Sequence, residues 1–166
     1  MHGDRLSTIF IASRCQAADL ELRRLVAITR VNNKKRQITG CLFWTGQYFA
    51  QILEGTSVQL SQAVSRLCDG GRQAAPRILF QSQIDARQFD NSHLAFLPAP
   101  DFEEAVAEAH AGGGRLHQFQ ILFALLVQEH HEYASEPREL RAPRPDAPQK
   151  QKPLQGEPAG AGIWGG

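Results

Sequence analysis

The stretch from Ile38 to Glu54 limits the fold more than any other part of this chain. It reads ITGCLFWTGQYFAQILE, which is two apolar runs separated by Thr45-Gly46. This spacing and this turn chemistry are typical of a β-hairpin. We therefore predict two antiparallel strands here, and the elements on either side of them decide the topology.

An amphipathic helix is predicted on each side of this hairpin. Before it, apolar residues recur at helical spacing after Asp19, a suitable N-cap; they are Leu22, Leu25, Val26 and Thr29. After it, apolar residues recur at i, i+4, i+7 and i+8 from Leu60 to Cys68 and stop at Gly70-Gly71. Both patterns predict helices that bury one side.

A first strand is predicted near the N-terminus. Residues 6–12, LSTIFIA, are largely apolar and β-branched, which favours a half-buried strand. Alternation then puts Ile9, Ile11 and Ser13 on one face. Phe10 lies on the opposite face.

Two more strands, at residues 77–84 and 93–97, complete the pattern. The order strand, helix, strand, strand, helix, strand, strand predicts an α+β fold, a ferredoxin-like βαββαββ sandwich with both helices on one sheet face. We assign residues 1–100 to this domain.

The rest of the chain divides into two segments. Residues 101–133 are expected to form a C-terminal helical extension: Asp101 would cap a short helix, and residues 115–133 form an additional C-terminal helix. Because ILFALLV lies at its centre, this helix is expected to cover the other sheet face or to pair with a second copy. Residues 134–166 contain six prolines and five glycines and predict a disordered Pro/Gly-rich tail.

Composition excludes several classes of protein. A net charge of +1 provides no global field to attract nucleic acid or an anionic membrane, so nucleic-acid binding is not expected. Three cysteines without a CxxC pair predict neither a zinc site nor a disulfide framework. No apolar run is long enough to span a bilayer or resembles a signal peptide, so we expect a soluble, cytoplasmic protein with no membrane contact.

The most specific signal is a set of short motifs at fixed mutual spacing. They are Asn32-Asn33, Ile38-Thr39-Gly40, and FAQILEG from Phe49 to Gly55. Together they resemble the signature of the BLUF family, in which two asparagines precede a turn into the second strand and a glutamine lies on the third. The resemblance extends from about Leu6 to Leu97. It implies a ferredoxin-like fold, FAD as cofactor and a role in sensing blue light.

The residue types agree with a flavin pocket. A flavin ring is flat and largely apolar, but one edge carries carbonyl and N–H groups, so carboxamides, which both donate and accept hydrogen bonds, suit it. By resemblance, Asn32 would hold this carbonyl edge, and Asn33 would contact it or close the helix. Gln51 would face the N5 atom and the C4 carbonyl.

Other side chains complete the expected flavin site. Leu25 would form part of an aliphatic wall. Arg66 and Arg72 would reach the phosphates or the ribityl chain, or are solvated surface charges.

The chain departs from the family pattern at the residues linked to photochemistry. In the family, excited flavin takes an electron and a proton from a first-strand tyrosine through the glutamine, but here Ile11 occupies that position. Ser92 and Leu94 occupy the positions of a tryptophan and a methionine linked to signal relay. Trp44 is the remaining aromatic candidate for a donor. We predict flavin binding with an absent or altered light response.

The alternatives differ in the class of protein. The leading hypothesis is a short BLUF protein that signals to an unknown downstream protein partner, with homo-oligomerisation left open. The main alternative is a flavin-free, light-insensitive interaction module on the same scaffold, which would purify without colour. An enzyme is not expected, because no nucleophile–base pair or metal-ligand set can be assembled from the sequence.

Overall fold

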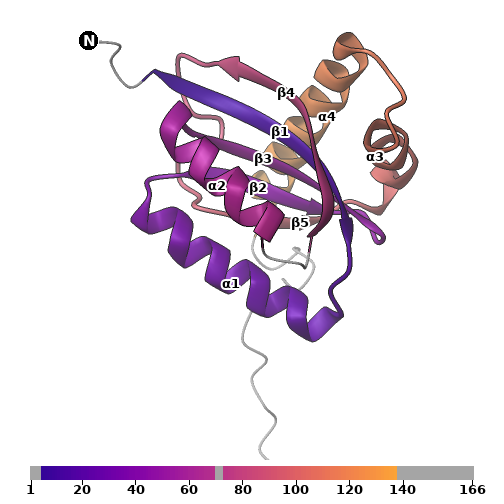
Figure 1. The fold of residues 1–166 in the computed structure, drawn as a ribbon, viewed down its shortest axis with the longest axis horizontal. Helices are drawn as coiled ribbons and strands as arrows, with labels where there is room; N and C mark the ends of the chain where they lie inside the picture. Colours follow the sequence, from indigo (N-terminus) through magenta and orange to yellow (C-terminus); the bar gives the residue numbers. More distant parts are fainter. Residues whose placement is uncertain (1–4, 70–72, 138–166) are drawn as a thin grey trace, which may run out of the picture.

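A mixed five-stranded sheet separates two pairs of helices in the computed structural model, which describes residues 5–69 and 73–137 (Figure 1). The strands are β1 (Leu6–Cys15), β2 (Thr39–Trp44), β3 (Tyr48–Thr56), β4 (Gln73–Gln83) and β5 (Ala95–Pro98). Their order is β4-β1-β3-β2-β5. All neighbours are antiparallel except β2 and β5, which are parallel. This confirms the predicted order of elements and the ferredoxin-like α+β fold.

The hairpin between β2 and β3 turns through Thr45, Gly46 and Gln47. Gly46 has a φ of 127°, a conformation that side-chain-bearing residues rarely adopt. The Thr45 N–H donates to the carbonyl of Tyr48 at 3.0 Å, which closes the turn. The predicted hairpin and its glycine are therefore both confirmed.

Helices α1 (Asp19–Lys35) and α2 (Ser57–Asp69) cover one face of the sheet. A hydrophobic cluster joins them to the strands, through residues that include Ile9, Ile11, Leu22, Val26, Phe49, Leu53 and Leu60. The predicted N-cap is wrong by one position, because α1 begins at Asp19 and its N-cap is Ala18, which makes no side-chain cap bond.

The opposite face is covered by α3 (Glu103–His110) and α4 (Leu116–Ser135), which follow a short 3-10 turn (Pro100–Phe102). Their buried side chains, among them Val106, Leu122 and Leu126, pack in a second cluster. Phe10, Phe43 and Ile52 belong to that cluster from the sheet side. The prediction that Asp101 caps the short helix is wrong, because its N-cap is Phe102, without a side-chain cap.

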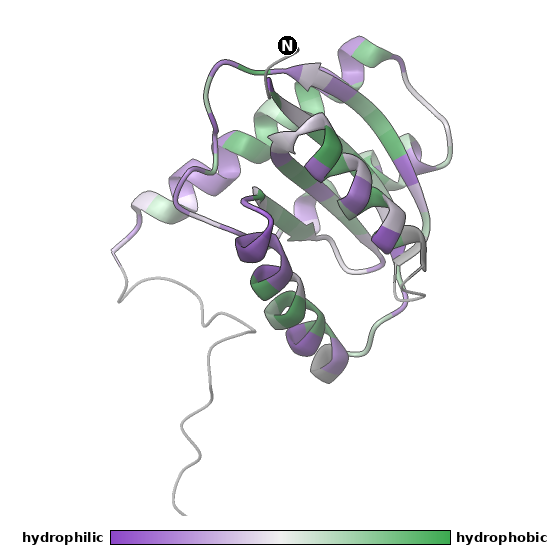
Figure 2. Ribbon diagram, turned by 60° about the vertical axis from the view of Figure 1, so that its left-hand side comes forward, coloured by the Kyte–Doolittle hydropathy of each residue, from purple (hydrophilic) through white to green (hydrophobic). Residues whose placement is uncertain are grey.

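Strand alternation explains why one sheet has two different faces. Figure 2 shows hydrophobic residues concentrated along the central strands. Ile11 packs toward α1 and α2, whereas its neighbour Phe10 packs toward α4. The predicted orientation of the first strand is thus correct.

Two predictions concern the C-terminal third of the chain. The division of the chain into a domain of residues 1–100 and an extension of residues 101–133 stays a prediction. Most of the predicted tail, residues 138–166, lies outside the described residues.

In residues 5–69 and 73–137, no helix has the length and apolar character needed to cross a membrane.

Candidate functional site

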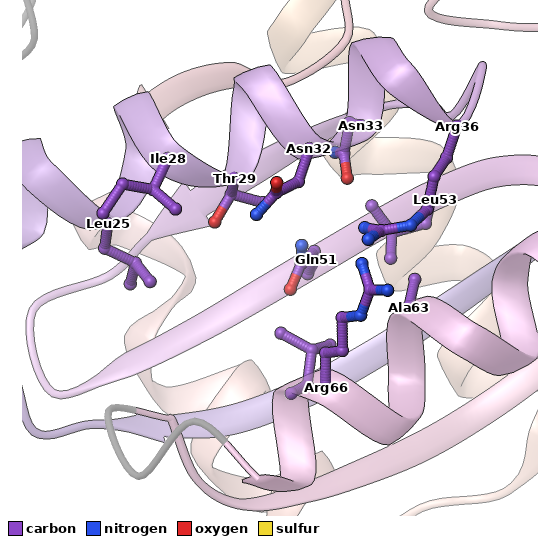
Figure 3. Close-up of a pocket in the computed structure, with 11 residues that line it drawn as sticks. Leu25, Ile28, Thr29, Asn32, Asn33, Arg36, Gln51, Leu53, Ala63 and Arg66 are labelled. Carbon is purple, nitrogen blue, oxygen red and sulfur yellow. The ribbon is translucent and has the colours of Figure 1, made fainter.

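A pocket of about 250 Å³ opens between α1 and α2 above the centre of the sheet (Figure 3). Its lining combines aliphatic side chains, three carboxamides and two arginines: Leu25, Ile28, Thr29, Asn32, Asn33, Arg36, Gln51, Leu53, Ala63, Arg66 and Leu67. Helix α1 and its C-cap supply six of these residues, α2 supplies three and β3 supplies two. Such a mixture of apolar walls and a few convergent polar groups is typical of small-molecule sites.

Gln51 forms the floor of the pocket from the central strand β3. It is only 1% exposed, and its neighbours in the sheet are Ile11 on β1 and Leu42 on β2. Alternation puts its side chain on the same face as Phe49 and Leu53, which belong to the cluster beneath α1 and α2. A buried amide on this face can meet a ligand that enters between the helices.

The two asparagines occupy the last turn of α1, where the helix ends above the sheet. Asn33 is 4% exposed and donates through Nδ2 to the carbonyl of His93 at 2.7 Å. Its own carbonyl accepts the N–H of Ile38 at 2.9 Å. Asn33 therefore fixes the end of the helix against the segment before β5. Figure 3 shows the Asn32 amide pointing from α1 toward Gln51.

Two arginines border the same end of the pocket. Arg36 is the C-cap of α1 and is half-buried, whereas Arg66 lies in the last turn of α2 and is exposed. Figure 3 shows both guanidinium groups directed into the space beside Gln51. Within the described part of the chain, no acidic side chain lines this pocket.

The structure brings together five of the residues that the sequence singled out for the pocket: Leu25, Asn32, Asn33, Gln51 and Arg66. That they bind flavin stays a prediction. Arg72 lies outside the described residues, so its predicted role cannot be compared with a position.

Sequence reasoning missed the other lining residues of α1. Ile28, Thr29 and Arg36 follow Leu25 and Asn32 at intervals of three or four residues, so they share one side of the helix. This spacing was visible in the sequence. It would have added all three residues to the expected site.

None of the three positions that depart from the family pattern is among the described residues that line this pocket. Ile11 is the direct sheet partner of Gln51, shares its face and is 1% exposed. Leu94 is buried in the same cluster, and its carbonyl accepts two N–H groups from Arg30 at 3.0 and 2.9 Å. The Ser92 carbonyl accepts the Gly40 N–H at 3.0 Å. The segment before β5 is therefore bonded to α1 and β2 through its backbone.

Trp44 lies on the same face of the sheet as Gln51 but is not among the described residues that line the pocket. Its indole Nε1 donates to the Gly46 carbonyl at 2.9 Å. Its ring centroid is 6.4 Å from that of Phe96. The indole is thus held at the hairpin turn.

A second buried polar group on β3 has protein partners on both of its oxygens. The Glu54 carboxylate accepts the N–H of Gln88 at 2.6 Å through Oε1. Its Oε2 accepts the Thr39 hydroxyl at 3.0 Å and the Phe89 N–H at 3.1 Å. Arg87 donates to the Glu54 carbonyl and to the Thr39 hydroxyl oxygen, both at 2.8 Å. This cluster is built to hold the fold rather than a ligand.

A larger cavity, of about 630 Å³, lies between the segment before β5 and the end of α4. Arg30, His93, His130 and Tyr133 are among its lining residues. We favour the smaller pocket as the site, because there three amides meet apolar walls. No cluster of His, Cys, Asp or Glu in residues 5–69 and 73–137 has the arrangement of a metal site.

A family model described as "BLUF: Sensors of blue-light using FAD" matches residues 6–95, more than half of the chain. This chain belongs to the BLUF family. The family consists of flavin-binding, blue-light-sensing modules, and the resemblance seen in the motifs is thereby confirmed.

Solved structures of BLUF proteins have the same fold. The dark-state structure of BlrB is 25% identical with a TM-score of 0.58, and the match covers 65% of this chain and 94% of that one. The BLUF domain of BlrP1, a Klebsiella pneumoniae protein, is 25% identical with a TM-score of 0.57. The match covers 74% of this chain and 88% of that one. Ground-state BlsA has a TM-score of 0.61 at 16% identity, over 74% and 87%. No curated protein sequence matches the chain.

Proposed function

We propose that this BLUF module binds FAD between α1 and α2, that it signals through contacts with another protein, and that its response to light is lost or altered. The observation that carries this proposal is the buried Gln51 at the floor of a pocket, with Ile11 directly opposite it in the sheet. The family match supports the cofactor, and the identity of residue 11 supports the altered response.

The chemistry of the pocket fits a flavin ring. Leu25 and Ile28 make one end aliphatic, and Asn32, Arg36 and Gln51 make the remainder polar. A flavin ring has a matching division into an apolar benzenoid end and a carbonyl edge. A volume of about 250 Å³ is slightly below the range of roughly 300–1,000 Å³ typical of ligand pockets. The pocket therefore suits the ring, with the rest of FAD extending outside.

A bound flavin supplies the absorption of blue light and can accept an electron and a proton. Gln51 contributes an amide that both donates and accepts hydrogen bonds, and burial limits its exchange with water. Asn33, tied to His93, fixes the helix end from which Asn32 reaches the pocket. These residues bind and orient the ring.

The residue opposite Gln51 determines how the module responds to absorbed light. In the family as a whole, a tyrosine there provides an electron and a proton that pass through the glutamine. The hydrocarbon side chain of Ile11 has no exchangeable proton and no accessible oxidation. We therefore expect Gln51 to keep its resting hydrogen bonds under illumination.

The output is expected to depend on protein contacts. Ser92 and Leu94 lack the aromatic and thioether groups that the family uses for relay, and their backbone bonds to Gly40 and Arg30 remain. A light-regulated adenylyl cyclase matches over only 36% of its length, so the likeness to that protein is limited to part of it. The downstream partner we propose is a separate protein.

The test is the visible absorption spectrum of the purified protein before and after blue illumination, together with two variants. We expect a yellow protein without a reversible red shift. Ile11→Tyr should introduce such a shift, and Ile11→Phe, which adds the ring without the hydroxyl, should not. Both variants enlarge a buried side chain, at a cost of about 1–3 kcal/mol, so Ile11→Phe also controls for packing.

Two results would contradict the proposal in different ways. A reversible red shift in the unmodified protein would show that Ile11 does not prevent photochemistry. A colourless protein that takes up no FAD on titration would favour the flavin-free interaction module instead.

A further inference from the structure

The flavin pocket contains more positive charge than a neutral ring requires. Arg36 and Arg66 both line it, and no carboxylate does so in the described part of the chain. Two guanidinium groups that point into one small space repel each other, and the repulsion grows as solvent is excluded. A ligand with electron-rich oxygens between them would relieve this repulsion.

Local geometry explains why Arg36 points into the pocket. Its N–H is bonded to the carbonyls of Asn32 and Asn33, at 3.2 and 3.1 Å, so it continues the last turn of α1. Asn32 and Arg36 are four residues apart and therefore share one side of the helix. The same turn thus aims a carboxamide and a guanidinium at the same end of the pocket, away from Leu25.

We propose that Arg36, assisted by Arg66, binds the carbonyl edge of the flavin ring and makes this pocket select ligands by the negative charge density of that edge. The inference rests on the proposed flavin binding and adds a residue that determines specificity. Guanidinium groups donate to acceptor oxygens through a planar set of N–H groups, and such charge-assisted bonds are about twice as strong as neutral ones. Arg36 is half-buried, so its bonds are shielded from solvent better than those of an exposed arginine.

The usual reason for a cation at a helix C-terminus is interaction with the helix dipole. Lys34 and Lys35 lie in the same turn, are exposed and do not line the pocket. They can satisfy the dipole without Arg36. Lys34 therefore provides a matched control, since Lys34→Gln removes one positive charge from this turn and leaves the lining intact.

The test compares dissociation constants of riboflavin and FMN, measured by quenching of flavin fluorescence, for the unmodified protein and for Arg36→Gln, Arg36→Lys, Arg66→Gln and Lys34→Gln. Riboflavin has the ring but no phosphate. If Arg36 binds the ring edge, Arg36→Gln weakens both ligands by the same factor, about tenfold. The dissociation constants of Arg36→Lys should lie between those of the unmodified protein and those of Arg36→Gln. Arg66→Gln should weaken binding less than Arg36→Gln does. Lys34→Gln should change either dissociation constant less than about twofold.

Other outcomes would overturn the inference in distinguishable ways. If Arg36→Gln and the unmodified protein had equal dissociation constants for both flavins, Arg36 would only interact with the helix dipole. The proposal that the pocket binds flavin would then still hold. A loss limited to FMN would assign the guanidinium to the phosphate. Failure of the unmodified protein to bind either flavin, or binding of AMP as tight as that of FMN, would remove the proposed function and the inference with it. Thermal unfolding of each variant separates these results from misfolding.

Discussion

Gln51 and Glu54 lie three residues apart on β3 and are almost equally buried, at 1% and 0% exposure, yet their surroundings differ. The odd spacing turns them to opposite faces of the sheet. The carboxylate of Glu54 accepts hydrogen bonds from Gln88, Phe89 and Thr39. Gln51 lines a cavity between two helices.

This comparison shows that a buried polar residue can have two different roles. A polar group surrounded by protein partners joins segments that are distant in sequence, because each bond holds a different loop. A polar group that faces a cavity leaves room for partners supplied by a ligand. The partners of Glu54 assign it to the stability of the fold. For Gln51, which lines the pocket, we propose an additional role in binding a ligand. Replacing each of the two residues separately with leucine tests this difference.

The largest loss of stability is expected for Glu54→Leu. The substitution removes the carboxylate that accepts two backbone N–H groups and the Thr39 hydroxyl. Each buried donor left without an acceptor costs about 1–3 kcal/mol, so the three together make this the largest expected loss. Urea denaturation measures it, and a midpoint equal to that of the unmodified protein would show that the cluster contributes little.

A smaller loss is expected for Arg87→Lys, which keeps the charge but not the planar fork. Arg87 donates to the Thr39 hydroxyl oxygen, the Glu54 carbonyl and the Gln37 carbonyl, at 2.8, 2.8 and 2.9 Å. A single ammonium group cannot serve all three positions, so we expect a cost of about 1–3 kcal/mol. Arg5→Lys, on an exposed arginine, is the matched control. Equal unfolding midpoints for the two variants would contradict the role given to Arg87.

Gln51→Leu should lower stability less than Glu54→Leu does, by about 0.5–1.5 kcal/mol, because a neutral amide hydrogen bond contributes about that much. The new side chain would join an apolar face that already contains Ile11, Leu42 and Phe49. Flavin affinity should nevertheless fall about tenfold, since at least one hydrogen bond to the ring is lost. Denaturation and a flavin titration on the same sample check both parts. A large loss of stability would mean that Gln51 belongs with Glu54.

Much of the fold was predictable because its signals are local. The alternation in residues 6–12 and the Thr45-Gly46 turn identified the strands and the faces correctly. Helix ends were less predictable: Asp19 and Asp101 are suitable caps by residue type, but the helices begin elsewhere. The start of a helix depends on how the preceding chain leaves the sheet, which residue type alone does not determine.

The pocket was predictable only in part, for a similar reason. Motif spacing pointed to Asn32 and Gln51, which lie on different elements and meet through the fold. Arg36 follows two lysines in the sequence, and only the packing of α1 against the sheet distinguishes it from Lys34. The partners of Glu54 come from the segment after β4, and no local pattern in β3 indicates them.

The smallest effect on stability is expected from the ionisation of Cys41, on the sheet face covered by α3 and α4. Cys41 is 0% exposed and packs in that cluster, and burial raises its pKa well above the ordinary value. Alkylating reagents attack the thiolate, so at pH 8.5 Cys41 should react far more slowly than the partly exposed Cys15. Because the folded-state pKa is the higher one, its contribution to stability is full below about pH 8.5 and falls as the pH rises above it. Mass mapping of alkylated peptides, with and without denaturant, measures the difference. Rapid alkylation of Cys41 in the native protein would show that this face opens as readily as the one with the pocket.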